Sequence, residues 1–206
     1  GLLKIRIKSW DGDEDYYLGL ESEFDFENET YDASIGSNPE YDTDVIRYNY
    51  TSLTTPSSVI DYNVVTQKEE IKKQQEVLGG VFDSKNYTSE RLFATGHDGI
   101  KIPISLVRHV DTELNKNTPI LQYAYGSYGS TIDPSFSSVR LSLLDRGFVF
   151  AIAHVRGSQY LGRSWYEDGR MLYKKNTFKD FVSSSKFLIE NNYTSKDHLY
   201  AEGGSA

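Results

Sequence analysis

The hydrophobic pattern changes near Gly79-Gly80, and this change limits the possible folds more than any other feature. Before it, residues 2–10 and 45–50 alternate apolar and polar side chains, which is typical of half-buried strands. After it, residues 120–125 and 148–153 form largely apolar runs, as strands of buried parallel sheets do. We therefore expect two units: residues 1–79, all-β, and residues 80–206, a sheet with helices on both faces.

Further short strands are expected in the first unit. Residues 23–27 alternate charged and aromatic side chains, and residues 58–63 follow the break at Thr55-Pro56. Such strands at short spacing suit either a propeller blade or a sandwich, and no internal repeat is long enough to choose between them. A charged segment, residues 68–76, leads to the expected boundary.

The second unit carries a hairpin signal and a helix signal. Asp98-Gly99 between residues 91–94 and 101–107 predicts a tight turn joining two strands. A helix is predicted from residue 177 to about residue 191, with Thr177 and Asp180 in a capping-box-like arrangement at its start. Its expected buried face comprises Phe178, Phe181, Val182, Ser185, Leu188 and Ile189.

The last residues combine a short strand with a glycine-serine turn. Leu199-Tyr200-Ala201 leads into Gly203-Gly204-Ser205, which matches the front of a nucleophile elbow, where a strained turn lifts a serine above a sheet. Gly-Gly-Ser alone is weak evidence, because turns and linkers contain it. Its context strengthens it: Tyr125-Gly126-Ser127-Tyr128-Gly129 follows a buried strand, where hydrolases place a loop of the oxyanion hole. Without the serine, this loop would be read as an aromatic surface turn.

The order of catalytic residues in such hydrolases places the acid and the histidine after the serine. The four histidines, His97, His109, His154 and His198, all precede Ser205, so none is expected to be the catalytic base. His154 ends a buried strand and is expected to be structural. We expect the missing acid and base beyond residue 206, and the 206-residue chain by itself to be inactive.

The charge of the chain limits its partners. A formal net charge of −8 argues against nucleic acid and anionic membranes, and it favours cationic substrates. Residues 11–32 contain many Asp and Glu and no Lys or Arg, most simply a solvated loop and strand face. The absence of cysteine excludes disulfides and a thiol nucleophile, and it suits a cytoplasmic enzyme, with a periplasmic one also possible. Neither a metal motif nor a phosphate loop is present.

Several longer motifs resemble one family closely. With the loop at residues 125–129, they are Ser52-Leu53-Thr54-Thr55-Pro56, Leu141-Ser142-Leu143-Leu144-Asp145-Arg146-Gly147, His154-Val155-Arg156-Gly157, Trp165-Tyr166-Glu167-Asp168-Gly169 and Lys175-Asn176-Thr177-Phe178. Together they make the chain similar to the prolyl oligopeptidase family of serine peptidases, and within it to the oligopeptidase B branch. The resemblance covers residues from about 45 to 206 and is weaker before that.

The resemblance implies a fold and a set of site residues. Residues 1–79 would be the C-terminal part of a seven-bladed β-propeller, and residues 80–206 the N-terminal part of an α/β-hydrolase domain. Ser205 would be the nucleophile. The Tyr125 hydroxyl and the backbone N–H of Ala206 would stabilise the oxyanion, and Tyr128 would line the pocket for the residue before the cut. No metal or organic cofactor is implied.

The oligopeptidase B likeness further implies cleavage of short peptides after Arg or Lys. Asp133 and Arg156 are the other expected substrate-binding residues. Relatives often carry Ile-Asp-x-Asp where this chain has Ile132-Asp133-Pro134-Ser135, which puts a preference for paired basic residues in doubt. A second departure is Ser158-Gln159-Tyr160, where relatives commonly carry two glycines and a glutamate.

Two alternatives remain open at this point. A post-proline peptidase of the same family would have an apolar pocket for the residue before the cut. A non-catalytic truncation that binds peptides or a partner chain would end with a genuine stop after Ala206. The sequence leaves open whether the protein is a monomer or a homodimer.

Overall fold

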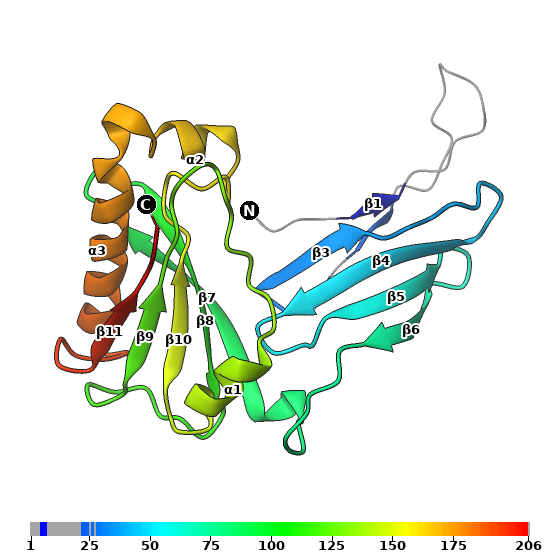
Figure 1. Ribbon diagram of the computed structural model, residues 1–206, viewed down its shortest axis with the longest axis horizontal. Coiled ribbons are helices and arrows are strands. Elements are labelled where there is room, and N and C mark those ends of the chain that lie inside the picture. The colour runs from blue at the N-terminus through cyan, green and yellow to red at the C-terminus, as the bar shows by residue number, and fades with distance from the viewer. Residues whose placement is uncertain (1–4, 8–21, 25, 27, 206) are drawn as a thin grey trace.

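Two sheets dominate the computed structural model, which describes residues 5–7, 22–24, 26 and 28–205 (Figure 1). The N-terminal sheet consists of β3 (Tyr31–Ile35), β4 (Val45–Ser52), β5 (Ser58–Asn63) and β6 (Lys68–Gln74), each antiparallel to the next. A short antiparallel pair, β1 (Arg6–Ile7) and β2 (Ser22–Glu23), accompanies it. The predicted strands at residues 45–50 and 58–63 are confirmed.

An aromatic core holds this sheet together. Tyr48 is almost fully buried and packs edge-on against Phe24, while Phe26 stacks on Tyr50. The predicted strands at residues 2–10 and 23–27 lie partly outside the described residues, which support only β1 and β2 there. The sequence pattern missed β6, because every residue of this strand is exposed and backbone pairing to β5 alone defines it.

The C-terminal sheet is mixed, in the order β11-β9-β10-β8-β7. Its strands are β7 (Tyr87–Thr95), β8 (Lys101–His109), β9 (Ile120–Tyr123), β10 (Val149–Ala153) and β11 (Leu199–Glu202). The predicted hairpin joins β7 to β8, and a short 3-10 helix, η1 (Ser84–Asn86), precedes it. β9 pairs in parallel with both β10 and β11, so the buried strands are confirmed.

Helices cover both faces of this sheet, as predicted (Figure 1). α3 (Lys175–Glu190) covers one face, where Leu188 joins Ile104, Leu106 and Ile120 in a buried cluster. α1 (Ser138–Leu144) lies on the other face. Between β10 and α3 the chain forms α2 (Arg163–Glu167) and a second 3-10 helix, η2 (Met171–Tyr173).

The core beneath α1 is shared by the two sheets. Leu53, which directly follows β4, packs with Val107, Leu144 and Ile152 in one buried cluster. Close by, the backbone N–H of Phe136 donates to Thr51 Oγ1 at 3.1 Å. The two units are therefore joined through apolar packing as well as through the chain.

The start and the buried face of α3 correct the sequence prediction. The helix begins at Lys175, and no side chain caps it, so Thr177 and Asp180 form no capping box. Both residues lie within the helix, and their side chains are buried, as is that of Ser184. By contrast, Phe178 is 59% exposed and Val182 is 50% exposed. The polar residues are inside because their partners lie beneath the helix, as described below.

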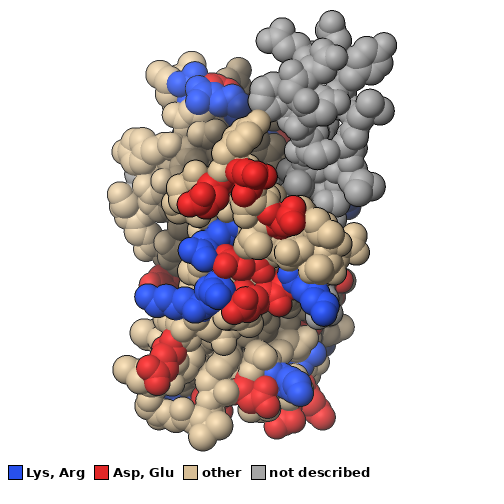
Figure 2. Space-filling view, turned by 90° about the vertical axis from the view of Figure 1, so that its right-hand side faces the viewer, with Lys and Arg blue, Asp and Glu red and all other residues tan. Residues whose placement is uncertain are grey.

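Figure 2 shows one face of the molecule, on which Lys and Arg side chains lie next to Asp and Glu side chains. Ion pairs of this kind on the N-terminal sheet include Arg47–Asp61 at 2.6 Å and Lys72–Glu70 at 2.9 Å. Among the described residues, no helix is long and apolar enough to cross a membrane.

Substitution of Leu53 by alanine should weaken both units together. The side chain is 2% exposed, and removing it from a packed core typically costs about 2–5 kcal/mol. We expect urea denaturation followed by circular dichroism to show this loss of unfolding free energy. The matched control is Val65→Ala, at a 70% exposed position; equal effects of the two substitutions would show that Leu53 does not join the units.

Candidate active site

A cavity of about 390 Å³ opens at the carboxyl ends of β9 and β11. Because these neighbouring strands are parallel, with Tyr123 opposite Glu202, the segments that follow them emerge at the same edge of the sheet. The cavity is lined by Ala124, Tyr125, Gly126, Val155, Thr177, Phe178, Phe181, Ala201, Glu202, Gly203, Gly204 and Ser205. Tyr125 and Ser205, far apart in the sequence, therefore share one cavity.

Ser205 has the backbone conformation of a strained turn. Its φ angle is +71°, which is uncommon for a residue with a side chain. The residue is exposed and lines the cavity directly after the two glycines. Such strain at an exposed serine after a strand is the geometry that a nucleophile elbow requires. Ala206, the expected second oxyanion donor, lies outside the described residues.

The loop at residues 125–129, called the oxyanion loop after the role expected from the sequence, is held at both ends by hydrogen bonds. At its start the carbonyl oxygen of Gly126 accepts from Lys174 Nζ at 2.7 Å. At its end the N–H of Gly129 donates to the Gly157 carbonyl oxygen at 3.0 Å. A side chain at Gly126 would not fit, since its Cβ would lie 2.4 Å from Thr177 Cγ2 and 2.8 Å from the Arg156 carbonyl oxygen.

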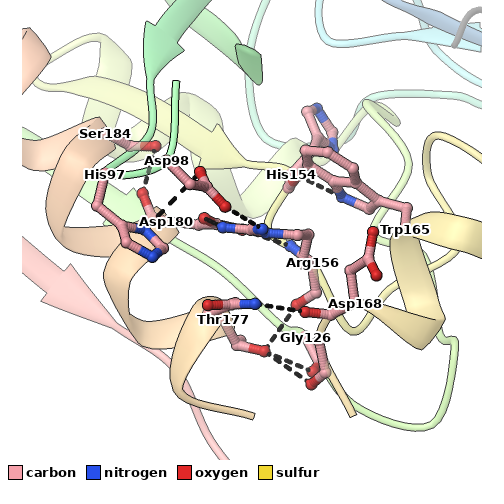
Figure 3. Close-up of polar contacts among 12 residues, drawn as sticks. His97, Asp98, Gly126, His154, Arg156, Trp165, Asp168, Thr177, Asp180 and Ser184 are labelled. Atoms are coloured by element: carbon pink, nitrogen blue, oxygen red, sulfur yellow. Dashed lines mark hydrogen bonds and ion pairs between the residues drawn. The ribbon is translucent and has the colours of Figure 1, made fainter. Parts of the chain in front are cut away.

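An ion-pair network is centred on the buried Arg156 (Figure 3), which directly follows the cavity-lining residue Val155. The Arg156 guanidinium donates to both carboxylate oxygens of Asp180, at 2.8 and 2.7 Å, and to Asp98 Oδ2 at 2.7 Å. Asp180 also accepts from the Arg156 backbone N–H at 3.0 Å. Burial acts to raise the pKa of Asp98, but the Arg156 hydrogen bond and charge outweigh it and hold that pKa below its ordinary value.

The network does not favour substrate binding by Arg156, the role expected from the sequence. The residue is 4% exposed, and two carboxylates already bind its guanidinium. It instead links the segment that follows β10, the β7–β8 turn and α3. The physical reason is that withdrawing a guanidinium from water is costly, and the two carboxylates offset that cost here.

Thr177 joins the network to the oxyanion loop (Figure 3). Its hydroxyl donates to the Arg156 carbonyl oxygen at 2.7 Å and lies 3.2 Å from the Gly169 carbonyl oxygen and 3.5 Å from that of Gly126. One buried hydroxyl thus touches three chain segments. This use of Thr177 explains why it does not cap α3.

The two remaining candidate substrate residues lie away from the cavity lining. Tyr128 has a φ angle of +59° and is 77% exposed, and it is not among the described residues that line the cavity. Asp133 is half-buried; burial, with a smaller contribution from the Asp32 carboxylate on β3, raises its pKa. Substrate contact by either residue stays a prediction.

His154 has the environment of a structural residue. Its Nε2 lies 2.7 Å from Ser105 Oγ, and its ring stacks on Tyr160 with centroids 3.6 Å apart. Burial and the charge of Arg91 lower the pKa of His154 well below its ordinary value. The imidazole is therefore neutral, and His154 is not among the described residues that line the cavity, which fits a structural role.

Sequence reasoning missed most of the residues that hold this site in shape. Asp98 was read only as part of a turn, and Asp180 only as part of a helix start. No role was predicted for Lys174, although it directly precedes the Lys175-Asn176-Thr177-Phe178 motif. No local sequence pattern reveals these roles, because the bonded residues are far apart in the chain. Asp180 lies 24 residues from Arg156, and the partners of Asp98 and Lys174 are at least 47 residues away from them.

Comparison with known proteins now identifies the family. A model of the prolyl oligopeptidase family matches residues 134–206, and a model of the N-terminal β-propeller domain of prolyl oligopeptidase matches residues 3–75. The chain belongs to the prolyl oligopeptidase family. The N-terminal sheet is thus part of the family's propeller, and the mixed sheet is the N-terminal part of its hydrolase domain. The expected division at residue 79 stays a prediction.

Individual relatives cover this chain well but are much longer. Dipeptidyl aminopeptidase BI of Pseudoxanthomonas mexicana is 44% identical over 206 residues, all of this chain and 27% of that protein. Prolyl endopeptidase of Elizabethkingia meningoseptica is 32% identical over 158 residues, 77% of this chain and 22% of that protein. The structure of oligopeptidase B from Leishmania major matches this structure with a TM-score of 0.85 and 38% sequence identity. The match covers 98% of this chain and 29% of the Leishmania chain. The chain therefore spans less than a third of each.

Substitution of Gly126 by alanine should displace the oxyanion loop. The new methyl group would meet Thr177, Val155 and the Arg156 backbone below 3 Å, and shifts on the order of 1 Å can cost about 100-fold in activity. We expect kcat/KM of the complete gene product for a peptide substrate to fall at least about 100-fold. Gly80→Ala is the control, since no atom lies within 4 Å of its added Cβ; a fully active Gly126→Ala protein would contradict the crowding.

Substitution of Arg156 by methionine should destabilise the protein by about 3–5 kcal/mol at pH 7, because it leaves buried carboxylates without a cation. In the wild type, the lowered pKa of Asp98 adds stability that is lost as pH falls below the ordinary aspartate value of about 3.9. In the variant, burial would act on Asp98 without the hydrogen bond and charge of Arg156, so the loss of unfolding free energy relative to the wild type should shrink as pH falls from 7 toward 4.5.

Denaturation at the two pH values measures this difference. Arg163→Met is the control, because Arg163 pairs with Glu167 at 2.6 Å on the surface, where such pairs contribute at most about 1 kcal/mol. An Arg156→Met deficit that stays the same at both pH values would argue against the uncompensated carboxylates as its cause.

Proposed function

We propose that the complete gene product is a serine peptidase that hydrolyses short peptides through an acyl-enzyme. The observation that carries the proposal is the shared cavity, in which Ser205 on a strained turn and Tyr125 on the oxyanion loop meet at the ends of two parallel strands. Membership of the prolyl oligopeptidase family supports the same chemistry.

In this mechanism Ser205 Oγ attacks the carbonyl carbon of the scissile peptide. A histidine, expected beyond residue 206, takes the serine proton and passes it to the leaving amine. The Tyr125 hydroxyl and the Ala206 N–H donate to the negative oxygen of the tetrahedral intermediate. Water then attacks the acyl-enzyme and releases the acid product. The propeller unit would restrict access to short peptides.

We propose Arg or Lys as the residue before the cut. The 38% identity to oligopeptidase B of Leishmania major and the net charge of −8 support a cationic substrate. A pair of carboxylates expected beyond residue 206 would bind the basic side chain by charge-assisted hydrogen bonds, and Asp133 is a candidate for a further contact. A post-proline specificity is the second candidate, favoured by the prolyl endopeptidase relative and by Phe178 and Phe181 in the cavity lining.

The first experiment is to sequence the gene past the codon for Ala206 and to express the complete product. Amino-blocked substrates with Arg, Lys or Pro before the cut then separate the candidates, and dipeptide substrates with a free amino group test for release of dipeptides. Cleavage after Pro but not after Arg would overturn the basic specificity. A stop codon directly after Ala206 would favour the non-catalytic binding protein.

Substitution of Tyr125 by phenylalanine removes one proposed oxyanion donor. We expect kcat to fall on the order of 10²–10³-fold with little change in KM, because the donor acts mainly in the transition state. Steady-state kinetics measures this, and Ser205→Ala, which should lose all activity and labelling by a fluorophosphonate, is the reference. A Tyr125→Phe protein with wild-type kcat would exclude the tyrosine from the oxyanion hole.

A further inference from the structure

Lys174 makes contacts that are unusual for a lysine. It directly precedes α3, and its side chain reaches back to the oxyanion loop, where Nζ donates to the Gly126 carbonyl oxygen at 2.7 Å and to Ser127 Oγ. These contacts span 48 and 47 residues of sequence. Burial lowers the pKa of Lys174, so its ammonium is taken partly out of water to make them.

The next residue, Lys175, differs from Lys174 in its exposure to water. Lys175 is exposed, as lysines usually are. A lysine that only needed to begin a helix would also keep its ammonium in water, because withdrawing a charge is costly unless hydrogen bonds replace its hydration. The contacts of Lys174 therefore point to a role at the oxyanion loop.

The Gly126 carbonyl oxygen is the point through which Lys174 acts on Tyr125. Gly126 follows Tyr125 directly, and Thr177 Oγ1 lies farther from this oxygen than Lys174 Nζ does, at 3.5 Å. The other end of the loop is fixed at Gly129. Without Lys174, the loop would lose its 2.7 Å hydrogen bond beside Tyr125, whereas the longer contact of Thr177 and the hydrogen bond at Gly129 would remain.

We propose that Lys174 is a positioning residue of the oxyanion hole, one that holds the loop so that the Tyr125 hydroxyl points at the developing oxyanion. This inference rests on the proposed function, in which Tyr125 is an oxyanion donor. Two of the three ammonium donors bind the loop, and the positive charge behind the loop also favours a negative charge in the cavity. Substrate binding itself does not involve Lys174.

The test compares Lys174→Met with Lys175→Met in the complete gene product. Methionine keeps the length of the side chain but removes its charge and its donors. For Lys174→Met we expect kcat to fall about tenfold or more, KM to stay within about twofold, and the affinity for a peptide aldehyde, whose adduct carries the oxyanion, to fall as kcat does. Lys175→Met should match the wild type in all three.

Rescue separates positioning from a merely structural role. Because the 206 residues contain no cysteine, Lys174→Cys can be alkylated with 2-bromoethylamine, which restores an ammonium at nearly the length of lysine. We expect the alkylated protein to recover most of its kcat. The wild type treated in the same way controls for cysteines elsewhere in the gene product.

Each outcome decides the matter. Equal kcat values for Lys174→Met and Lys175→Met would overturn the proposal. So would a Lys174→Met protein in which kcat falls, KM rises and the melting temperature falls together, if Lys174→Cys also regains no kcat on alkylation. If the wild type itself fails to react with a fluorophosphonate at Ser205, the proposed function fails and the inference falls with it, a result distinct from the other two.

Discussion

The arrangement of the site depends on the buried pair of Arg156 and Asp180. Taking two charges out of water costs several kcal/mol for each ion, and only well-formed hydrogen bonds offset that cost. Here both carboxylate oxygens accept from the guanidinium, and the Arg156 N–H binds the same carboxylate. Such a pair has few acceptable geometries, so the end of β10 and the first turns of α3 are fixed relative to each other. Lys174 and Thr177 then reach the oxyanion loop from a defined position.

The second constraint is the sharing of one apolar core by the two units. Leu53 comes from the propeller side, whereas Val107, Leu144 and Ile152 come from the hydrolase side. The hydrogen bond from the Phe136 N–H to Thr51 Oγ1 lies in the same region, seven residues after the end of the oxyanion loop. A motion of the propeller relative to the hydrolase sheet would therefore first displace the segment that carries Asp133 and Phe136. This gives the propeller unit a mechanical connection to the segment that follows the oxyanion loop.

The sequence predicted the parts of the fold that follow from local hydrophobic pattern. Continuous apolar runs predicted β9 and β10, and Asp98-Gly99 predicted the β7–β8 turn. The same reasoning predicted α3 as a helix but misjudged its start and part of its buried face, where Thr177 and Asp180 bind Arg156. It also missed β6, whose residues are all exposed. For the site, the motif at Ser205 and the tyrosine-glycine loop were visible in the sequence. The supporting residues Asp98 and Lys174 were not, because their partners become neighbours only in the folded chain.

Three chain segments that are distant in sequence pack closely against one another at Gly126, Gly157 and Gly169. A Cβ on Gly157 would lie 2.0 Å from the Gly126 carbonyl oxygen, and one on Gly169 would lie 2.1 Å from the Gly157 backbone nitrogen. A side chain cannot be added at Gly157 or Gly169 unless the neighbouring backbone shifts. Laboratory evolution of specificity would therefore gain little from randomising any of these segments alone. Variation is cheaper at the exposed side chains of Tyr128 and Gln159, and grafting from a relative should transfer residues 125–129, 156–160 and 169–177 as one block.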